Sequence, residues 1–156
     1  MDNNDILRRI RYALDISDDQ MIGIFGLAHA IDQSSLTALL RKEGEDGFVA
    51  CSRKVLELFL DGLILHKRGR KVDAHVRHAT YSPALTNNVI LKKLRIALEL
   101  KEDDMISTLK LAGLDISRAE LSALFRKEGH RNYKACGDQI LRKFLAGLST
   151  RYRKQH

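Results

Sequence analysis

The chain is one sequence unit written twice, and this duplication constrains its fold more than any other feature. The pair Asn3-Asn4 returns as Asn87-Asn88, followed in both places by apolar residues in the same order. The string ALLRKEG at residues 38–44 returns almost unchanged as ALFRKEG at residues 123–129. Repetition at a fixed period indicates that each unit forms the same supersecondary structure. The sequence therefore predicts two copies of one small fold.

Each copy predicts four helices, because apolar residues recur at intervals of three and four and strand-like alternation is hard to find. Ser17 with Gln20 and Ser117 with Glu120 have the spacing of capping boxes at helix starts. In the first copy the helices are expected from about Asn4 to Asp15, from Ser17, from about Ser34 to Glu43 and from near Ser52. In the second copy the last three are expected from Lys101, from Ser117 to Glu128 and from near Asp138.

These helices predict an all-α protein, a tandem duplication of a four-helix unit with about eight helices packed in one compact body. The domains are a first helical repeat at residues 1–65, a basic linker at 66–84 and a second helical repeat at 85–156. The linker prediction rests on Gly69, Pro83 and the lack of helical periodicity between them.

Some apolar residues lie outside the faces that one copy needs for its own core. Tyr12 falls on the charged side of its helix, between Arg8 and Arg9. Leu58 and Leu65 add a second apolar stripe to the last helix of the first copy, and a helix that is apolar on two sides is usually buried on two sides. We expect this helix to pack against the second copy or against another chain.

The charge pattern makes anionic partners plausible. The net charge is +7 and the pI about 9.6, and residues 1–65 are net acidic whereas both later segments are net basic. A group of cations could neutralise several phosphates, which would give salt-dependent binding; the alternative is a solvated surface. The candidate nucleic-acid-binding residues are Lys67, Arg68, Arg70, Lys71, Lys92, Lys93, Arg95, Arg151, Arg153 and Lys154.

No motif predicts catalysis, a metal site or a cofactor. The chain has no glycine-rich phosphate loop, no His-x-x-x-His helix and no nucleophile elbow. The acidic clusters Asp18-Asp19 and Glu102-Asp103-Asp104 stand at helix starts, where carboxylates favour the helix dipole. Cys51 and Cys136 could be a redox pair or half of a metal site, but small buried thiols are the favoured interpretation. We expect a protein that is not an enzyme.

The N-terminal residues MDNNDILRRI lack the basic end and apolar run of a secretory signal, and no apolar stretch has membrane-spanning length. A cytoplasmic protein without a membrane partner is therefore expected.

The segments NNDILRRIRYAL, LRKEGEDGFVAC, LFLDGLILHKRG, NNVILKKLRIAL and CGDQILRKFLAGL together resemble the YehS-like family of uncharacterised bacterial proteins, in which a helical domain of unknown function occurs in tandem. The resemblance covers nearly the whole chain. It implies an all-helical duplicated architecture in a bacterial cytoplasm, and it supplies no activity, cofactor or site residue.

Two functional hypotheses remain. The first is a nucleic-acid-associated binding module that uses the cations above. The second is a protein-interaction adaptor or a homo-oligomeric helical scaffold. The repeated RKEG string is either a helix terminus, with Gly44 in the left-handed conformation, or a pair of matched charged contacts. The candidate interaction residues are Tyr12, Arg41, Lys42, Leu58, Leu65, Arg126 and Lys127.

Overall fold

The computed structural model describes residues 1–69 and 84–153, and within these ranges it contains eight α-helices and no strand. The all-α, duplicated architecture is confirmed. The first copy comprises α1 (Asn3–Leu14), α2 (Asp18–Gly26), α3 (Gln33–Leu40) and α4 (Arg53–Arg68). The second comprises α6 (Asn87–Ala97), α7 (Glu102–Leu111), α8 (Arg118–Leu124) and α9 (Asp138–Arg153). None of these helices is both long enough and apolar enough to cross a membrane.

The helices start at local hydrogen bonds that the sequence predicts. Both predicted capping boxes are confirmed: Ser17 caps α2 together with Gln20, and Ser117 caps α8 together with Glu120. At α7 the backbone N–H of Lys101 donates to Asp104 at 2.8 Å. That bond is the first cause of the lowered pKa of the Asp104 carboxyl. At least this member of the second acidic cluster therefore serves the helix end, as predicted.

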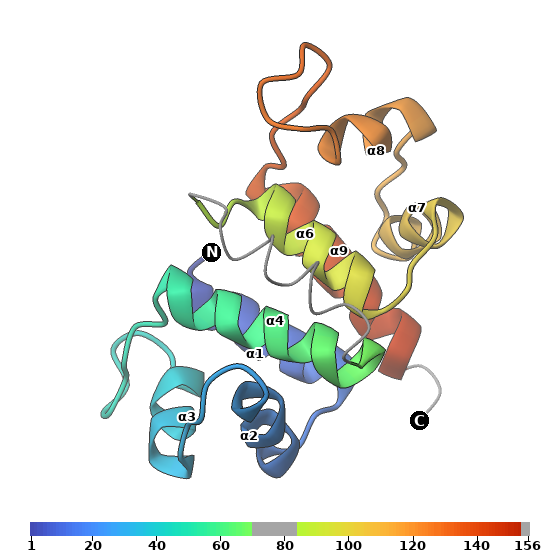
Figure 1. Cartoon of the computed structure of the whole chain (residues 1–156). Helices are drawn as coiled ribbons and strands as arrows, with labels where there is room; N and C mark the ends of the chain where they lie inside the picture. Colours follow the sequence, from blue (N-terminus) through green and yellow to red (C-terminus); the bar gives the residue numbers. More distant parts are fainter. Residues whose placement is uncertain (70–83, 154–156) are drawn as a thin grey trace.

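The two copies lie side by side and pack against each other through their first and last helices (Figure 1). The first helix of each copy packs on the last helix of the other, α1 on α9 and α6 on α4. These four helices form the middle of the molecule, with α2 and α3 at one end and α7 and α8 at the other (Figure 1). The prediction that the last helix of the first copy packs against the second copy is confirmed.

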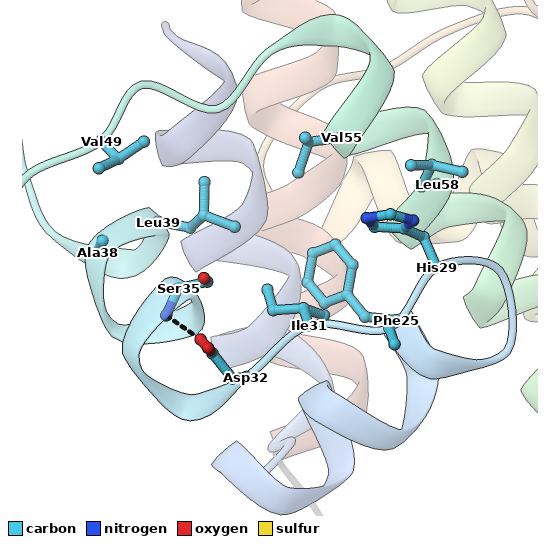
Figure 2. A pocket seen from close by; sticks show the side chains of 11 residues that line it. Phe25, His29, Ile31, Asp32, Ser35, Ala38, Leu39, Val49, Val55 and Leu58 are labelled. Carbon is cyan, nitrogen blue, oxygen red and sulfur yellow. Dashed lines mark hydrogen bonds between the residues drawn. The ribbon is translucent and has the colours of Figure 1, made fainter.

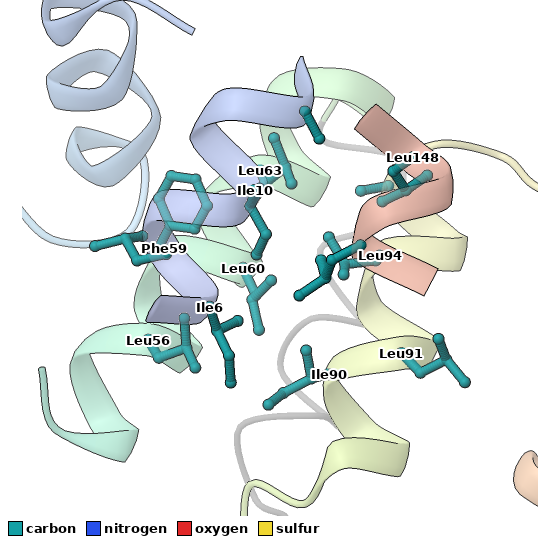
Figure 3. Close-up of a cluster of buried hydrophobic side chains, with 14 of the residues drawn as sticks. Ile6, Ile10, Leu56, Phe59, Leu60, Leu63, Ile90, Leu91, Leu94 and Leu148 are labelled. Atoms are coloured by element: carbon teal, nitrogen blue, oxygen red, sulfur yellow. The ribbon is translucent and has the colours of Figure 1, made fainter. Parts of the chain in front are cut away.

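The core is accordingly shared. Buried side chains of both copies belong to one hydrophobic cluster, in which Ile6 and Ile10 of α1 meet Leu60 of α4 and Leu94 of α6 (Figure 3). Each such side chain contributes roughly 1.5–3 kcal/mol when it leaves water. Because much of this burial crosses between the copies, neither copy encloses a complete core of its own.

Two matched glycines bring the outer helices close to the central ones. A Cβ at Gly62 would lie 2.1 Å from the carbonyl oxygen of Ile24, and a Cβ at Gly147 would lie 2.0 Å from that of Thr108. Glycine therefore allows α4 to approach α2, and α9 to approach α7, at backbone contact distance.

The structure corrects two boundaries. The third helix of each copy ends at Leu40 or Leu124, before the RKEG string, rather than at Glu43 or Glu128. Gly44 and Gly129 do have positive φ, 92° and 96°, but they shape the following loop instead of ending the helix. In addition, α4 continues to Arg68, three residues into the segment predicted as linker. Residues 70–83 lie outside the described residues.

Candidate functional site: a basic groove

A groove runs between α1, α9 and the loop at residues 41–52. It consists of two adjoining cavities, one of about 600 Å³ and one of about 420 Å³, which share Arg8 and Tyr12. We call it the basic groove because its walls carry five cations around one exposed aromatic ring. Its defining residues are Arg8, Arg9, Arg11, Tyr12, Lys42 and Arg153.

The loop that brings Lys42 to the groove is held by a buried asparagine. The Asn4 side-chain amide donates to the carbonyl oxygens of Leu39 and Val49, each at 2.9 Å. Its oxygen accepts from the backbone N–H of Cys51, also at 2.9 Å. In addition, Arg8 donates to the Arg41 carbonyl oxygen at 2.7 Å. Buried amides require such partners, so Asn4 fixes the loop against α1.

The second copy repeats this asparagine clasp. The side-chain amide of Asn88 donates to the carbonyl oxygens of Leu124 and Lys134, and its oxygen accepts from the N–H of Cys136 at 2.8 Å. Sequence reasoning assigned no role to Asn4 or Asn88, although the doubled Asn-Asn pair was the visible signal. This clasp gives Asn4 and Asn88 the same role in both copies, which accounts for their repetition.

Tyr12 is the exposed aromatic residue of the groove, with 60% of its surface accessible. The Arg153 guanidinium lies 4.1 Å from the centre of its ring. Arg153 also donates to the Tyr12 carbonyl oxygen at 2.9 Å and pairs with Asp15 at 3.1 Å. The end of α9 is thus attached to the end of α1, and within the described residues most of the Tyr12 side chain stays open to solvent.

Some cations of the groove form an ion pair with a carboxylate, and others do not. Arg8 pairs with Asp5 at 2.6 Å and Arg11 with Asp18 at 2.5 Å. Arg9 and Lys42 form no ion pair within the described part of the chain, and the Nε atom of Arg9 is buried there without a hydrogen-bond partner. The unbalanced positive charge of the groove therefore comes mainly from Arg9 and Lys42.

Several of the cations predicted to bind phosphate are engaged in contacts within the chain. Lys93 does not project from its helix: its side chain is 2% exposed and pairs with Asp61 of α4. Arg68 pairs with Glu99 at 2.9 Å, and Arg151 pairs with Asp104 at 3.3 Å. Lys67 and Lys92 are exposed as expected. Arg70, Lys71 and Lys154 lie outside the described residues.

Arg95 is also engaged within its own copy. Its guanidinium lies 4.8 Å from the centre of the Phe125 ring, and its Nε donates to the Leu100 carbonyl oxygen at 3.0 Å. Nearby, Arg126 and Lys127 line a cavity of about 440 Å³ together with Lys92. The RKEG string of the second copy therefore also faces a basic cavity, at the position equivalent to Arg41 and Lys42 of the first copy.

The two leucines of the predicted apolar stripe lie in different surroundings. Leu58 lines a cavity of about 360 Å³ with Phe25, Ile31 and Val49, enclosed by α2, α3 and α4 (Figure 2). Leu65 is half-buried against the core. The face of α4 that contacts α6 carries Asp61, as part of the buried ion pair. The interpretation of Leu58 and Leu65 as interaction residues stays a prediction.

The cysteines are small buried residues, as the favoured interpretation held. Cys51 and Cys136 are 5% and 6% exposed, and both are free thiols. Burial raises the pKa of each thiol to about 11, so both stay protonated at neutral pH. Within residues 1–69 and 84–153, no three His, Cys, Asp or Glu side chains cluster in a way that could hold a metal ion.

Comparison with known proteins assigns the chain to a family. Residues 3–69 and 87–154 each match the family described as "Protein of unknown function (DUF1456)". The chain belongs to this family. Its two matches coincide with the two copies of the unit. The chain is also 41% identical to the uncharacterized protein YehS of Escherichia coli (strain K12), over 150 residues that cover 96% of this chain and 95% of that protein. No solved structure matches.

Proposed function

We propose that the protein is a cytoplasmic, non-enzymatic binding module that associates with single-stranded nucleic acid through the basic groove. The observation that carries this proposal is the exposed ring of Tyr12 among Arg8, Arg9, Lys42 and Arg153. Proteins that bind single strands combine cations that follow the phosphate backbone with aromatic rings on which bases stack. The groove supplies both features within one surface.

The groove also suits a strand better than a duplex. A single strand can turn one base onto the Tyr12 ring while its phosphates approach Arg9 and Lys42. A duplex reader needs a helix or ribbon that enters the major groove. Here α1 lies beside α9 and the loop at residues 41–52, which leaves its cations recessed in a cavity.

Fluorescence anisotropy with a labelled single-stranded oligonucleotide tests the proposal. We expect binding at low salt whose log affinity falls linearly with log salt, by about 0.7 per phosphate contacted. Tyr12→Ala should weaken binding by about 1–3 kcal/mol, the usual value of one stacked base. Leu111→Ala, which removes an exposed apolar side chain of α7 that lines neither cavity of the groove, is the control.

A matched pair of lysines tests the electrostatic part. Lys42→Ala should lower the affinity and reduce the salt slope, because Lys42 lines the groove. Lys127→Ala alters the equivalent loop of the second copy, away from Tyr12, and should change binding less. Absence of binding at low salt, or binding that does not respond to salt, would exclude the proposed function.

A second candidate is a protein-interaction adaptor or homo-oligomer. It is favoured by the cavity around Leu58, whose wall includes Phe25 and Ile31, and by Val49 at its edge, which is 53% exposed. Tyr12 adds a further exposed apolar surface. Light scattering at high protein concentration distinguishes the homo-oligomer from a monomer, and a monomer would remove that version of the hypothesis.

A further inference from the structure

The contact between α4 and α6 contains a buried charge cluster. Lys93 of α6 and Asp61 of α4 form an ion pair in which both side chains are 2% exposed. Glu57, one turn before Asp61, is also buried, and burial raises the pKa of its carboxyl while Lys93 opposes that shift. A cation can remain in such a place only because a carboxylate of the other copy faces it.

The duplication places an equivalent contact elsewhere in the molecule, between α1 and α9. In the alignment of the two copies, Arg9 corresponds to Lys93 and Ala146 corresponds to Asp61. The position of Glu57 is taken by Arg142. The cation is thus kept in the second contact, while both acidic residues are replaced, one by alanine and one by another cation.

The structure shows a cavity where the carboxylate would be. Arg9 and Ala146 line the same cavity of about 600 Å³, together with Ser149 and Thr150 of α9. The Nε atom of Arg9 is buried and donates to no acceptor within the described residues. Arg9 is only partly exposed, and no carboxylate pairs with its guanidinium within the described residues, so the positive charge that lines this cavity is not neutralised there.

We propose that the cavity between α1 and α9 is a phosphate site, in which a phosphate oxygen accepts from Arg9 at the place that the Asp61 carboxylate holds in the other contact. The guanidinium fork suits phosphate, and Lys42 on the same cavity adds a second positive charge. Asp5 also lines the cavity, but it is paired with Arg8. The choice of phosphate among anions rests on the proposed function.

The volume of the cavity allows more than a free anion. A space of about 600 Å³ lies within the usual size range of small-ligand pockets, roughly 300–1,000 Å³. Tyr12 lines both this cavity and the second cavity of the groove. The phosphate could therefore belong to a nucleic-acid strand or to a phosphorylated small molecule, and both sources would use Arg9 in the same way.

The decisive variant restores the missing carboxylate. Ala146→Asp in the full chain should occupy the site from within and lower the affinity for inorganic phosphate at least tenfold, measured by NMR titration at low salt. Ala119→Asp makes the same charge change on the exposed surface of α8 and should leave phosphate binding unchanged. Arg9→Met should abolish phosphate binding, and Arg9→Lys should retain part of it. Thermal unfolding without phosphate checks that each variant is folded.

The titration has three arms: inorganic phosphate, a nucleoside monophosphate and a single-stranded oligonucleotide. The inference is overturned if the wild-type chain binds no phosphate, or if Ala146→Asp binds phosphate as the wild type does. Oligonucleotide binding without phosphate binding would overturn the inference and leave the proposed function standing. Phosphate and nucleotide binding sensitive to Ala146→Asp, without oligonucleotide binding, would exclude the proposed function and support the site.

Discussion

Lys93 and Asp61, from different copies of the duplicated unit, form a buried ion pair at the contact between α6 and α4. Each charge has left water, so each depends on the other for its solvation. The pair therefore fixes how the two copies meet, since a sliding of α4 along α6 would leave a buried charge without its partner.

Removal of Asp61 should strongly destabilise the fold. Asp61→Ala leaves the Lys93 ammonium buried, and we expect the free energy of unfolding to fall by about 3–5 kcal/mol in urea denaturation. The triple variant Glu57→Met, Asp61→Leu and Lys93→Met removes all three charged side chains of the buried cluster and should recover most of that loss. A cost below about 1 kcal/mol for Asp61→Ala would show that Lys93 reaches solvent in solution.

The asparagine clasp predicts a local effect on the loop before α9. Asn88→Ala leaves the Cys136 N–H and two carbonyl oxygens without hydrogen-bond partners. Each buried polar group that loses its partner lowers the stability by about 1–3 kcal/mol. Hydrogen exchange at the Cys136 amide should accelerate more than global stability falls. Asn87→Ala is the control, because Asn87 is only half-buried and donates to the Cys136 carbonyl and to Asp138. Equal exchange in the two variants would contradict the clasp.

Much of this fold could be predicted because its signals are local. Capping boxes, apolar spacing and the duplication are each visible within a few residues or by comparing the two copies, and the structure confirms them. The sequence did not show that Lys93 is buried. Lys92 and Lys93 are neighbours of the same type, and only contact with α4, which is distant in sequence, separates the buried lysine from the exposed one.

Part of the basic groove could also be predicted from a local sequence signal. The position of Tyr12 on the charged side of its helix indicated an aromatic residue that needs a partner to cover it, and in the structure 60% of Tyr12 is exposed. The cavity itself needs α9 and the loop after α3, so no local pattern showed it. A comparison of Asp61 with Ala146 was the one sequence signal that could have pointed to it.

The hydrogen bond at the start of α7 predicts a pH-dependent stability. The Lys101 N–H, and to a smaller extent Arg151, lower the pKa of Asp104 below its ordinary value of 3.8. The stabilisation is therefore complete above that value and is lost as pH falls through the lowered pKa of the folded state. Asp104→Asn should be less stable than the wild type near pH 7, and the two should converge in strong acid. Arg151→Gln should keep most of the pH dependence, because the backbone bond remains.

The packing of the first helix of each copy on the last helix of the other predicts that neither copy folds by itself. A fragment of residues 1–69 would lack α9, which covers α1, and α6, which covers α4. Its Ile6, Ile10 and Leu60 would lose much of their apolar surroundings. A fragment of residues 84–156 would lose α1 and α4 in the same way, so each should show weak helicity by circular dichroism.

Mixing the two fragments should restore the native helical signal and a cooperative thermal transition, because the contacts between α1 and α9 and between α4 and α6 need no covalent link. As a control, fragment 1–69 with Asp61→Ala should associate more weakly, since the buried Lys93 of its partner would be unpaired. A fragment of residues 1–69 that is monomeric, fully helical and cooperatively folded would contradict the shared core, and would make each copy an independent domain.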